Sequence, residues 1–146
     1  MRAFFLAEEN VENIEELYAI ERECFGGSWT VEMLSEEWDN PLSVTVTRRE
    51  DGRLAAFALG RVVASEGELY QIGTLCEFRR LGIAEKLLAE LHGKMREKGA
   101  EVCFLEVRSR NAAAIALYEK CGYERISVRK GYYPDDDAVI MRRLLK

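Results

Sequence analysis

The stretch "FRRLGIAEKLL", Phe78–Leu88, decides the fold, because the chain changes there from a strand pattern to a helix pattern. From Ile83 onward, apolar residues recur three and four positions apart, as they do along one face of a helix. Arg79, Arg80 and Gly82 stand directly before this helix. A helix N-terminus carries free N–H groups and a partial positive charge, so the stretch predicts an anion-binding site.

The chain before this stretch reads as strands and helices that lead up to it. Residues 42–49, 53–64 and 67–75 are strand-like runs separated by tight turns, which predicts an antiparallel meander. Ahead of the meander, "RAFFLA" predicts a short first strand over residues 2–7, Asn10 predicts the start of a first helix, and residues 31–38 predict a second.

The chain after the stretch completes a sheet. A buried strand over 101–107 precedes a helix over 111–122, and residues 123–133 and 138–145 predict a closing strand pair. The order β-α-α-β-β-β-α-β-α-β-β predicts an α/β fold, with a mixed, mostly antiparallel central sheet flanked by helices. No linker, repeat or low-complexity run interrupts residues 1–146, which predicts a single domain.

Composition excludes several classes of function. Hydrophobic residues make up 48% of the chain and charged residues 32%, as in ordinary globular proteins, and the net charge of −5 disfavours nucleic-acid binding. The four cysteines are scattered and there is a single histidine, which predicts reduced thiols and no metal site. The apolar run at the N-terminus is too short for a signal peptide or a membrane span, which predicts a cytoplasmic protein.

The residues at the helix start match a known cofactor loop. Arg79, Gly82 and Ala84 satisfy the spacing [Gln/Arg]-x-x-Gly-x-[Gly/Ala] and resemble the acetyl-CoA diphosphate loop of the GNAT superfamily of N-acetyltransferases. The order of elements is also similar to that superfamily. Three further segments resemble the RimI-type ribosomal-protein-alanine N-acetyltransferases: "ECFGGSWT", "LEVRSRNAAAIALYEKCGYE" and "YYP…DAVIM".

The resemblance implies a role for particular residues. Glu106 matches the general base, Tyr118 the general acid, and Asn111 a contact to the pantetheine arm. Trp29, Tyr132 and Tyr133 lie in regions that border the acceptor peptide. The remaining residues expected to bind the cofactor are Ile72, Gly73 and Thr74, through their backbone, and Arg79, Arg80, Leu81, Gly82, Ile83, Ala84 and Glu85, around the diphosphate.

The resemblance also implies a reaction. Acetyl-CoA serves as co-substrate, with no metal, and its acetyl group passes directly to the N-terminal alanine of a small-subunit ribosomal protein. An α-amine has a pKa of about 7.7–8, so a base has only part of the population left to deprotonate near neutral pH. A tyrosine, with a pKa of about 10, still holds a proton that it can give to the departing thiolate.

Other interpretations stay open on the residues alone. Glu106 is equally placed to be a structural partner of Arg108 or Arg110, Tyr118 to be part of the core, and the three aromatic residues to be packing. The acceptor is open between α-amines, lysine side chains and small amines. A CoA-binding sensor without turnover is an alternative of another class, and the oligomeric state is undetermined.

Overall fold

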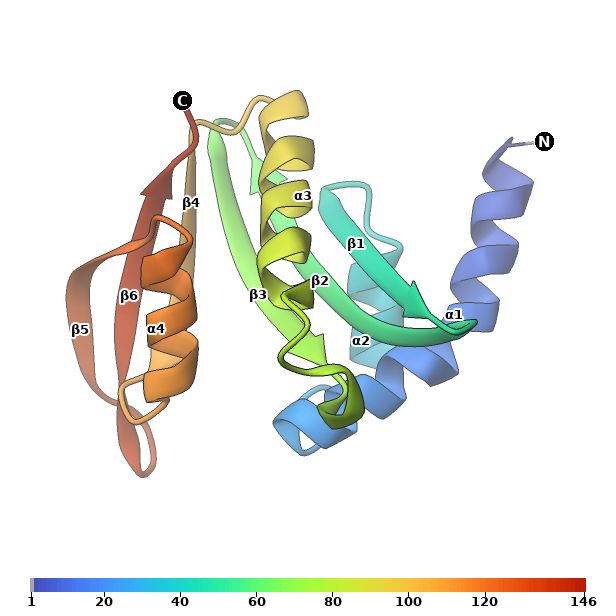
Figure 1. Ribbon diagram of the computed structural model, residues 1–146. Coiled ribbons are helices and arrows are strands. Elements are labelled where there is room, and N and C mark those ends of the chain that lie inside the picture. The colour runs from blue at the N-terminus through green and yellow to red at the C-terminus, as the bar shows by residue number, and fades with distance from the viewer. Residues whose placement is uncertain (1) are drawn as a thin grey trace.

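The computed structural model describes the backbone of residues 2–146 and the side chains of residues 14–146. Within this part of the chain, four α-helices and a short 3-10 helix, Cys76–Phe78, surround one sheet of six strands (Figure 1). The helices are α1 (Arg2–Phe25), α2 (Val31–Trp38), α3 (Ile83–Glu97) and α4 (Ala112–Lys120). The strands are β1 (Ser43–Glu50), β2 (Arg53–Val63), β3 (Glu66–Thr74), β4 (Val102–Arg108), β5 (Glu124–Tyr133) and β6 (Asp136–Leu144).

The sheet has the strand order β1-β2-β3-β4-β6-β5, and its first three strands form the antiparallel meander that the sequence predicts. β3 and β4 run parallel because α3 crosses over between them, and β4, β6 and β5 continue antiparallel. The mixed, mostly antiparallel sheet is therefore confirmed. The expected second, third and fourth helices are also confirmed, to within about two residues at each end.

The expected first strand over residues 2–7 is wrong, because α1 runs without a break from Arg2 to Phe25. Asn10, expected to start this helix, lies inside it. The segment contains no proline and no glycine before Gly26, and its Ala, Leu and Glu residues favour a helix. Adding residues to an existing helix is easier than starting a new element, so the helix extends through the segment.

Two apolar layers hold the helices on opposite faces of the sheet. Figure 1 shows α3 and α4 on one face and α1 and α2 on the other. The first layer contains twenty buried residues, among them Leu88, Leu91, Met95, Leu105 and Met141. The second contains Leu17, Ile20, Leu34, Trp38, Leu54, Phe57 and Leu59. Because side chains on a strand alternate between faces, the central strands can supply both layers.

A β-bulge in the middle of β3 exchanges the two faces of that strand. Tyr70 is the extra residue in the register between β2 and β3. Before the bulge, a Cβ on Gly67 would meet Met95 of α3, and after it a Cβ on Gly73 would meet Cys24 of α1. In a regular strand Gly67 and Gly73 would share one face. The bulge therefore turns the end of β3 before the chain enters the loop ahead of α3.

The cysteines are spread over both faces of the sheet and the loop ahead of α3. All four cysteines are free thiols, as the sequence predicts; Cys103 is buried, Cys24 and Cys121 are partly buried, and Cys76 is exposed. None of the helices described here is long and apolar enough to cross a bilayer.

Candidate active site

The central feature of the candidate site is a fork between β3 and β4. The two strands pair only over Glu66–Glu68 and Val102–Phe104, and they separate beyond that point (Figure 1). Separation of paired strands exposes backbone N–H and C=O groups that a neighbouring strand would otherwise satisfy. A pocket of about 710 Å³ occupies the fork, which is within the usual size range of small-molecule sites.

Glu106 projects from β4 into this pocket. Its carboxylate accepts a hydrogen bond from the guanidinium of Arg129 on β5, with a distance of 2.9 Å between Nη1 and Oε1. Arg108, which the sequence offers as a partner, instead pairs with Asp135. The side chain of Glu106 is 28% exposed, so the carboxylate remains accessible from the pocket while the ion pair holds it.

Tyr118 and Asn111 reach the same pocket from α4. The Asn111 side chain accepts a hydrogen bond from the N–H of Ala114 at 3.1 Å, so it also caps this helix. Burial raises the pKa of Tyr118 to about 12. The phenol therefore keeps its proton throughout the neutral range, as a proton donor must. Its ring packs against the ring of Tyr123, with 5.8 Å between centroids.

Three aromatic side chains form the outer wall of the pocket. Trp29, in the loop between α1 and α2, packs against Tyr70 with 6.0 Å between ring centroids. Tyr132 and Tyr133, at the end of β5, are in edge contact at 5.1 Å. The guanidinium of Arg108 lies 4.1 Å from the Tyr133 ring centroid and fixes that ring in place. All three residues expected near the acceptor thus lie on one pocket.

The expected diphosphate loop forms a second, smaller pocket at the N-terminus of α3. Gly82 is the N-cap, with φ +75, and no side chain caps the helix there. The first intrahelical bond in this turn runs from Lys86 to the Gly82 carbonyl, which leaves the N–H groups of Ile83, Ala84 and Glu85 available to an anion. A pocket of about 190 Å³ is lined by Thr74, Arg79, Arg80, Gly82, Ile83, Ala84 and Glu85, together with Phe78 and Leu117.

The two pockets are lined by neighbouring residues of the same elements. Ile72 lines the larger pocket and Thr74 the smaller, two residues apart on β3. On α4, Tyr118 lines the larger pocket and the adjacent Leu117 lines the smaller. An extended ligand with an anionic end at α3 would therefore pass along the exposed edge of β3 toward Glu106. The donors and the open strand edge fit the acetyl-CoA that the resemblance implies.

Two of the residues expected to bind the cofactor do not line either pocket. Leu81 is 59% exposed. Gly73 packs its Cα against α1, where an added Cβ would lie 3.0 Å from Ile20 and 3.2 Å from Cys24. Its lack of a side chain therefore serves the packing of α1 on β3, and only its backbone is available to a ligand.

Two carboxylates near the pocket were not predicted from the sequence. Glu68 lines it from β3, at the last paired position before the fork. Glu21 of α1 is fully buried behind it, and its Oε2 accepts hydrogen bonds from Ser28, Trp29 and Gln71 at 3.0–3.2 Å. Glu21 thereby anchors the Trp29 loop to β3. A single glutamate in a strand or helix pattern carries no local signal of such a role.

The acidic turn between β5 and β6 has an internal function. Asp135 pairs with Arg108, Asp136 accepts hydrogen bonds from Ser109 and the N–H of Arg110, and Asp137 accepts one from the N–H of Gly131. The bonds of Asp135 and Asp136 fasten the hairpin to the end of β4, the strand that carries Glu106, and the bond of Asp137 lies within the hairpin. In the described side chains, no group of three or more His, Cys, Asp or Glu residues is arranged to hold a metal ion.

Comparisons with known proteins agree with this geometry. Residues 14–123 match the family model described as the acetyltransferase (GNAT) family. The [ribosomal protein bS18]-alanine N-acetyltransferase of Escherichia coli K12 is 35% identical over 129 residues, covering 85% of this chain and 86% of that protein. The corresponding protein of Haemophilus influenzae is 31% identical over 135 residues, covering 88% and 90%. The crystal structure of the ribosomal-protein-S18-alanine N-acetyltransferase from Escherichia coli superposes with a TM-score of 0.85 at 30% identity, covering 92% of this chain and 89% of that one.

Proposed function

The chain belongs to the GNAT acetyltransferase family, and on this premise we propose that it transfers an acetyl group from acetyl-CoA to the N-terminal α-amine of a protein. As a member of this family it is an N-acetyltransferase. We propose the N-terminal alanine of a small-subunit ribosomal protein as the acceptor, because the two relatives named above act on alanine of ribosomal protein bS18. Residues 1–146 would act as one catalytic domain, and in the cytoplasm, where ribosomal proteins are made.

The observation that carries the proposal is the convergence of Glu106 and Tyr118 on one pocket. They come from β4 and α4, and both line the pocket in the fork between β3 and β4. Acyl transfer to an amine needs a proton acceptor on the nitrogen and a proton donor on the sulfur. A carboxylate and a protonated phenol in the same pocket supply both.

The cofactor would be bound by two groups of residues. The N–H groups of Ile83, Ala84 and Glu85, with Arg79 and Arg80, would hold the diphosphate at the N-terminus of α3. Ile72, Gly73, Thr74 and Asn111 would bind the pantetheine arm, three of them through the open edge of β3. When bound, acetyl-CoA supplies the activated acetyl group.

Proton transfer would then involve two side chains of the pocket. Glu106 would accept a proton from the acceptor amine, directly or through a water molecule. Tyr118 would protonate the departing sulfur; its raised pKa, about 12, ensures that the proton is present at neutral pH. A backbone N–H at the fork would stabilise the negative charge that develops on the acetyl oxygen.

The acceptor would approach through the aromatic wall. Trp29, Tyr132 and Tyr133 surround the open side of the pocket. Amphipathic aromatic rings suit the first residues of an extended peptide, because they offer large apolar contact area with few rotatable bonds. The groove combines the loop between α1 and α2 with the end of β5, and we propose that this part of the site sets the acceptor.

Acetyl transfer to a short peptide panel, followed by mass spectrometry, tests the proposal. Three peptides begin with alanine, serine or methionine, and a fourth has a blocked N-terminus and a free lysine. Acetylation confined to the α-amine of the alanine peptide supports the proposed acceptor. Acetylation of the blocked peptide's lysine would overturn it, and binding of acetyl-CoA without transfer to any peptide would favour a sensor.

A further inference from the structure

We propose that Glu68 is a second catalytic carboxylate, which accepts the first proton from the ammonium form of the acceptor, while Glu106 accepts the second. This inference rests on the proposed function, because it concerns the same reaction and the same pocket. It adds a residue that the family motifs do not include, and it assigns a separate proton to each carboxylate.

The fork places the two carboxylates on one pocket. Glu68 lies opposite Phe104 in the last paired register of β3 and β4. Glu106 lies two residues, or about 7 Å, further along β4 on the same face. Both side chains line the pocket. Partial desolvation, and after it the charge of Glu106, raise the pKa of Glu68.

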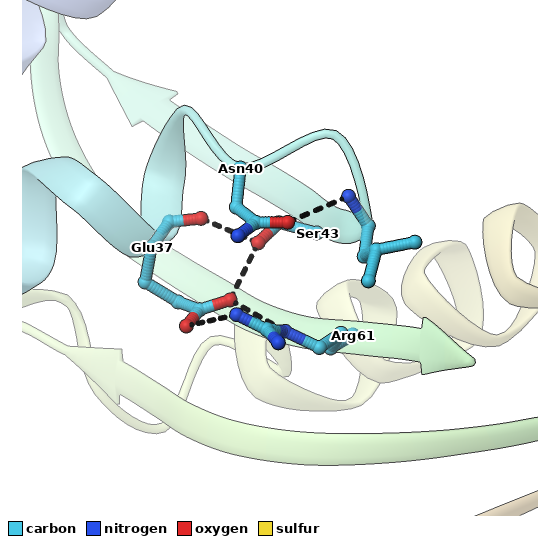
Figure 2. A network of polar contacts seen from close by, with 5 residues as sticks. Glu37, Asn40, Ser43 and Arg61 are labelled. Carbon is cyan, nitrogen blue, oxygen red and sulfur yellow. Dashed lines mark hydrogen bonds and ion pairs between the residues drawn. The ribbon is translucent and has the colours of Figure 1, made fainter.

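The cation that lies opposite Glu68 in the sheet is already engaged elsewhere. Arg61 lies opposite Glu68 in the register of β2 and β3. Figure 2 shows its guanidinium bound to both carboxylate oxygens of Glu37, with N–O distances of 3.0 and 2.8 Å. The hydroxyl of Ser43 donates a further hydrogen bond to the same carboxylate at 2.7 Å. This network holds Arg61 toward α2, although its charge still lowers the pKa of Glu68 in part.

The two carboxylates consequently differ in their surroundings. Glu106 has the guanidinium of Arg129 at 2.9 Å. Among the side chains described, none makes a hydrogen bond or an ion pair with Glu68, which remains accessible to solvent on the pocket wall. The neighbouring phenols of Tyr70 and Tyr133 have raised pKa values because of burial, and so stay protonated. A cationic ammonium group entering the pocket would find its counter-charge at Glu68.

The reaction requires two protons to leave the nitrogen. An ammonium group has no lone pair, so its first proton must move to a base, here Glu68, before the nitrogen can attack the acetyl carbon. The N–C bond then forms, and the second proton moves to Glu106 as the C–S bond breaks. Tyr118 gives its proton to the sulfur and regains one from Glu106, while the proton on Glu68 passes to solvent. The balance is one amide, one thiol and one released proton.

The test compares Glu68→Gln with Glu66→Gln in steady-state transfer to the alanine peptide between pH 6.5 and 9.5. Glu66 lies two residues away on the same strand, is exposed and lines neither pocket, which makes it a matched control. We expect Glu68→Gln to lower kcat about tenfold at pH 6.5–7, because roughly a tenth of the α-amine is already neutral there. The loss should shrink above about pH 8.5, where the α-amine, with a pKa of about 7.7–8, is already neutral. Glu66→Gln should match the wild type throughout.

For Glu106→Gln we expect a loss of kcat that persists at alkaline pH. The second proton becomes acidic only when the N–C bond forms, so alkaline pH should not rescue this variant. Unchanged kcat in Glu68→Gln, a rise in KM alone, or a loss that persists to pH 9.5 would overturn the role of Glu68. Wild-type protein that acetylates no peptide α-amine would overturn the proposed function itself. Equal melting temperatures and equal acetyl-CoA affinity of the variants exclude misfolding as the cause.

Discussion

Tyr118 shows how burial shapes the chemistry of one side chain. Its ring packs against Tyr123, and desolvation raises the pKa of its hydroxyl to about 12. Tyr118→Phe keeps the ring and removes the proton. We expect kcat to fall about 10²–10⁴-fold, with the Kd of acetyl-CoA nearly unchanged, as steady-state kinetics and calorimetry would measure. Equal losses of affinity and rate would make Tyr118 a structural residue.

The motifs in the sequence identified Glu106, Tyr118 and Asn111, and the structure brings all three to one pocket. Their catalytic and binding roles stay predictions. The ion-pair partner of Glu106 could not be predicted: Arg129 lies on β5, beyond β6 in the sheet, whereas the nearby Arg108 pairs with Asp135. Pairing of side chains depends on strand order, and distance along the chain is a poor guide to it.

Among helices and strands, the bulge in β3 leaves no room for a side chain at the facing residue of β2, Gly60. A Cβ on Gly60 of β2 would lie 2.5 Å from the carbonyl oxygen of Glu68 and 2.8 Å from Met95. The oxygen belongs to backbone and cannot move aside cheaply. We expect Gly60→Ala to lower the free energy of unfolding by about 1–3 kcal/mol, measured by urea denaturation.

Gly93→Ala is the matched control for this clash. Gly93 lies inside α3, and a Cβ there has no atom within 4 Å. Alanine is a better helix former than glycine by about 1 kcal/mol, so this variant should be stabilised. If both alanine variants were stabilised alike, the close approach of β2 and β3 at the bulge would not exist in solution.

The N-terminus of α3 depends on the backbone conformation of Gly82. Its φ of +75 is costly for any residue with a Cβ, although no atom lies within 4 Å of the added carbon. We expect Gly82→Ala to cost about 1–2 kcal/mol of stability and to weaken acetyl-CoA binding about tenfold, because the N–H groups would turn away from the diphosphate.

Gly52 allows the two effects to be separated. It has a similar φ of +77 and equally open surroundings, but lies in the turn between β1 and β2, outside both pockets. Gly52→Ala should lose similar stability without any change in acetyl-CoA affinity, measured by calorimetry. A similar loss of affinity in both variants would show that general destabilisation, and not the loop, weakens binding.

Most helices and strands were predictable because their signals are local. Turn residues separate β1, β2 and β3, and the spacing of apolar residues changes at Gly82. The first strand was predicted wrongly for the same reason. A short apolar run fits either element, and the continuity of α1 decided between them.

At the scale of the whole molecule, the buried side chain of His92 links α3 to the sheet. Its fully buried ring accepts a hydrogen bond from Arg143 at Nδ1, 2.8 Å away, and its Nε2 lies 2.6 Å from the hydroxyl of Tyr123. Arg143 can only donate, so Nε2 carries the ring proton and donates to Tyr123. That hydroxyl donates in turn to the sulfur of Cys103 at 3.2 Å. The network links α3 to β4, β6 and the start of β5.

This network predicts a dependence of stability on pH. Burial, and then the charges of Arg143 and Arg96, lower the pKa of His92 from 6.5 to about 4. In the unfolded chain His92 therefore binds a proton below about pH 6.5, whereas in the folded protein it binds one only below about pH 4. We expect the His92 contribution to the free energy of unfolding to fall by about 2 kcal/mol between pH 7.5 and 5.

His92→Gln isolates this contribution, since glutamine does not titrate while other groups of the protein still do. Urea denaturation at pH 7.5 and pH 5 should show a smaller loss of stability for the variant than for the wild type. Identical losses in the two proteins would mean that His92 is protonated in the folded state within this range.

The amino-acid sequence was sufficient for the order of most elements, for the mixed sheet and for the helix-start motif, because periodicity, turns and caps act between residues close in the chain. The tertiary structure decided the rest. The fork between β3 and β4, the engagement of Arg61 by Glu37, and the placement of Glu68 and Glu106 on one pocket all join segments that are distant in sequence. Such contacts depend on strand order and register, which are set only when the whole sheet packs between its two layers of helices.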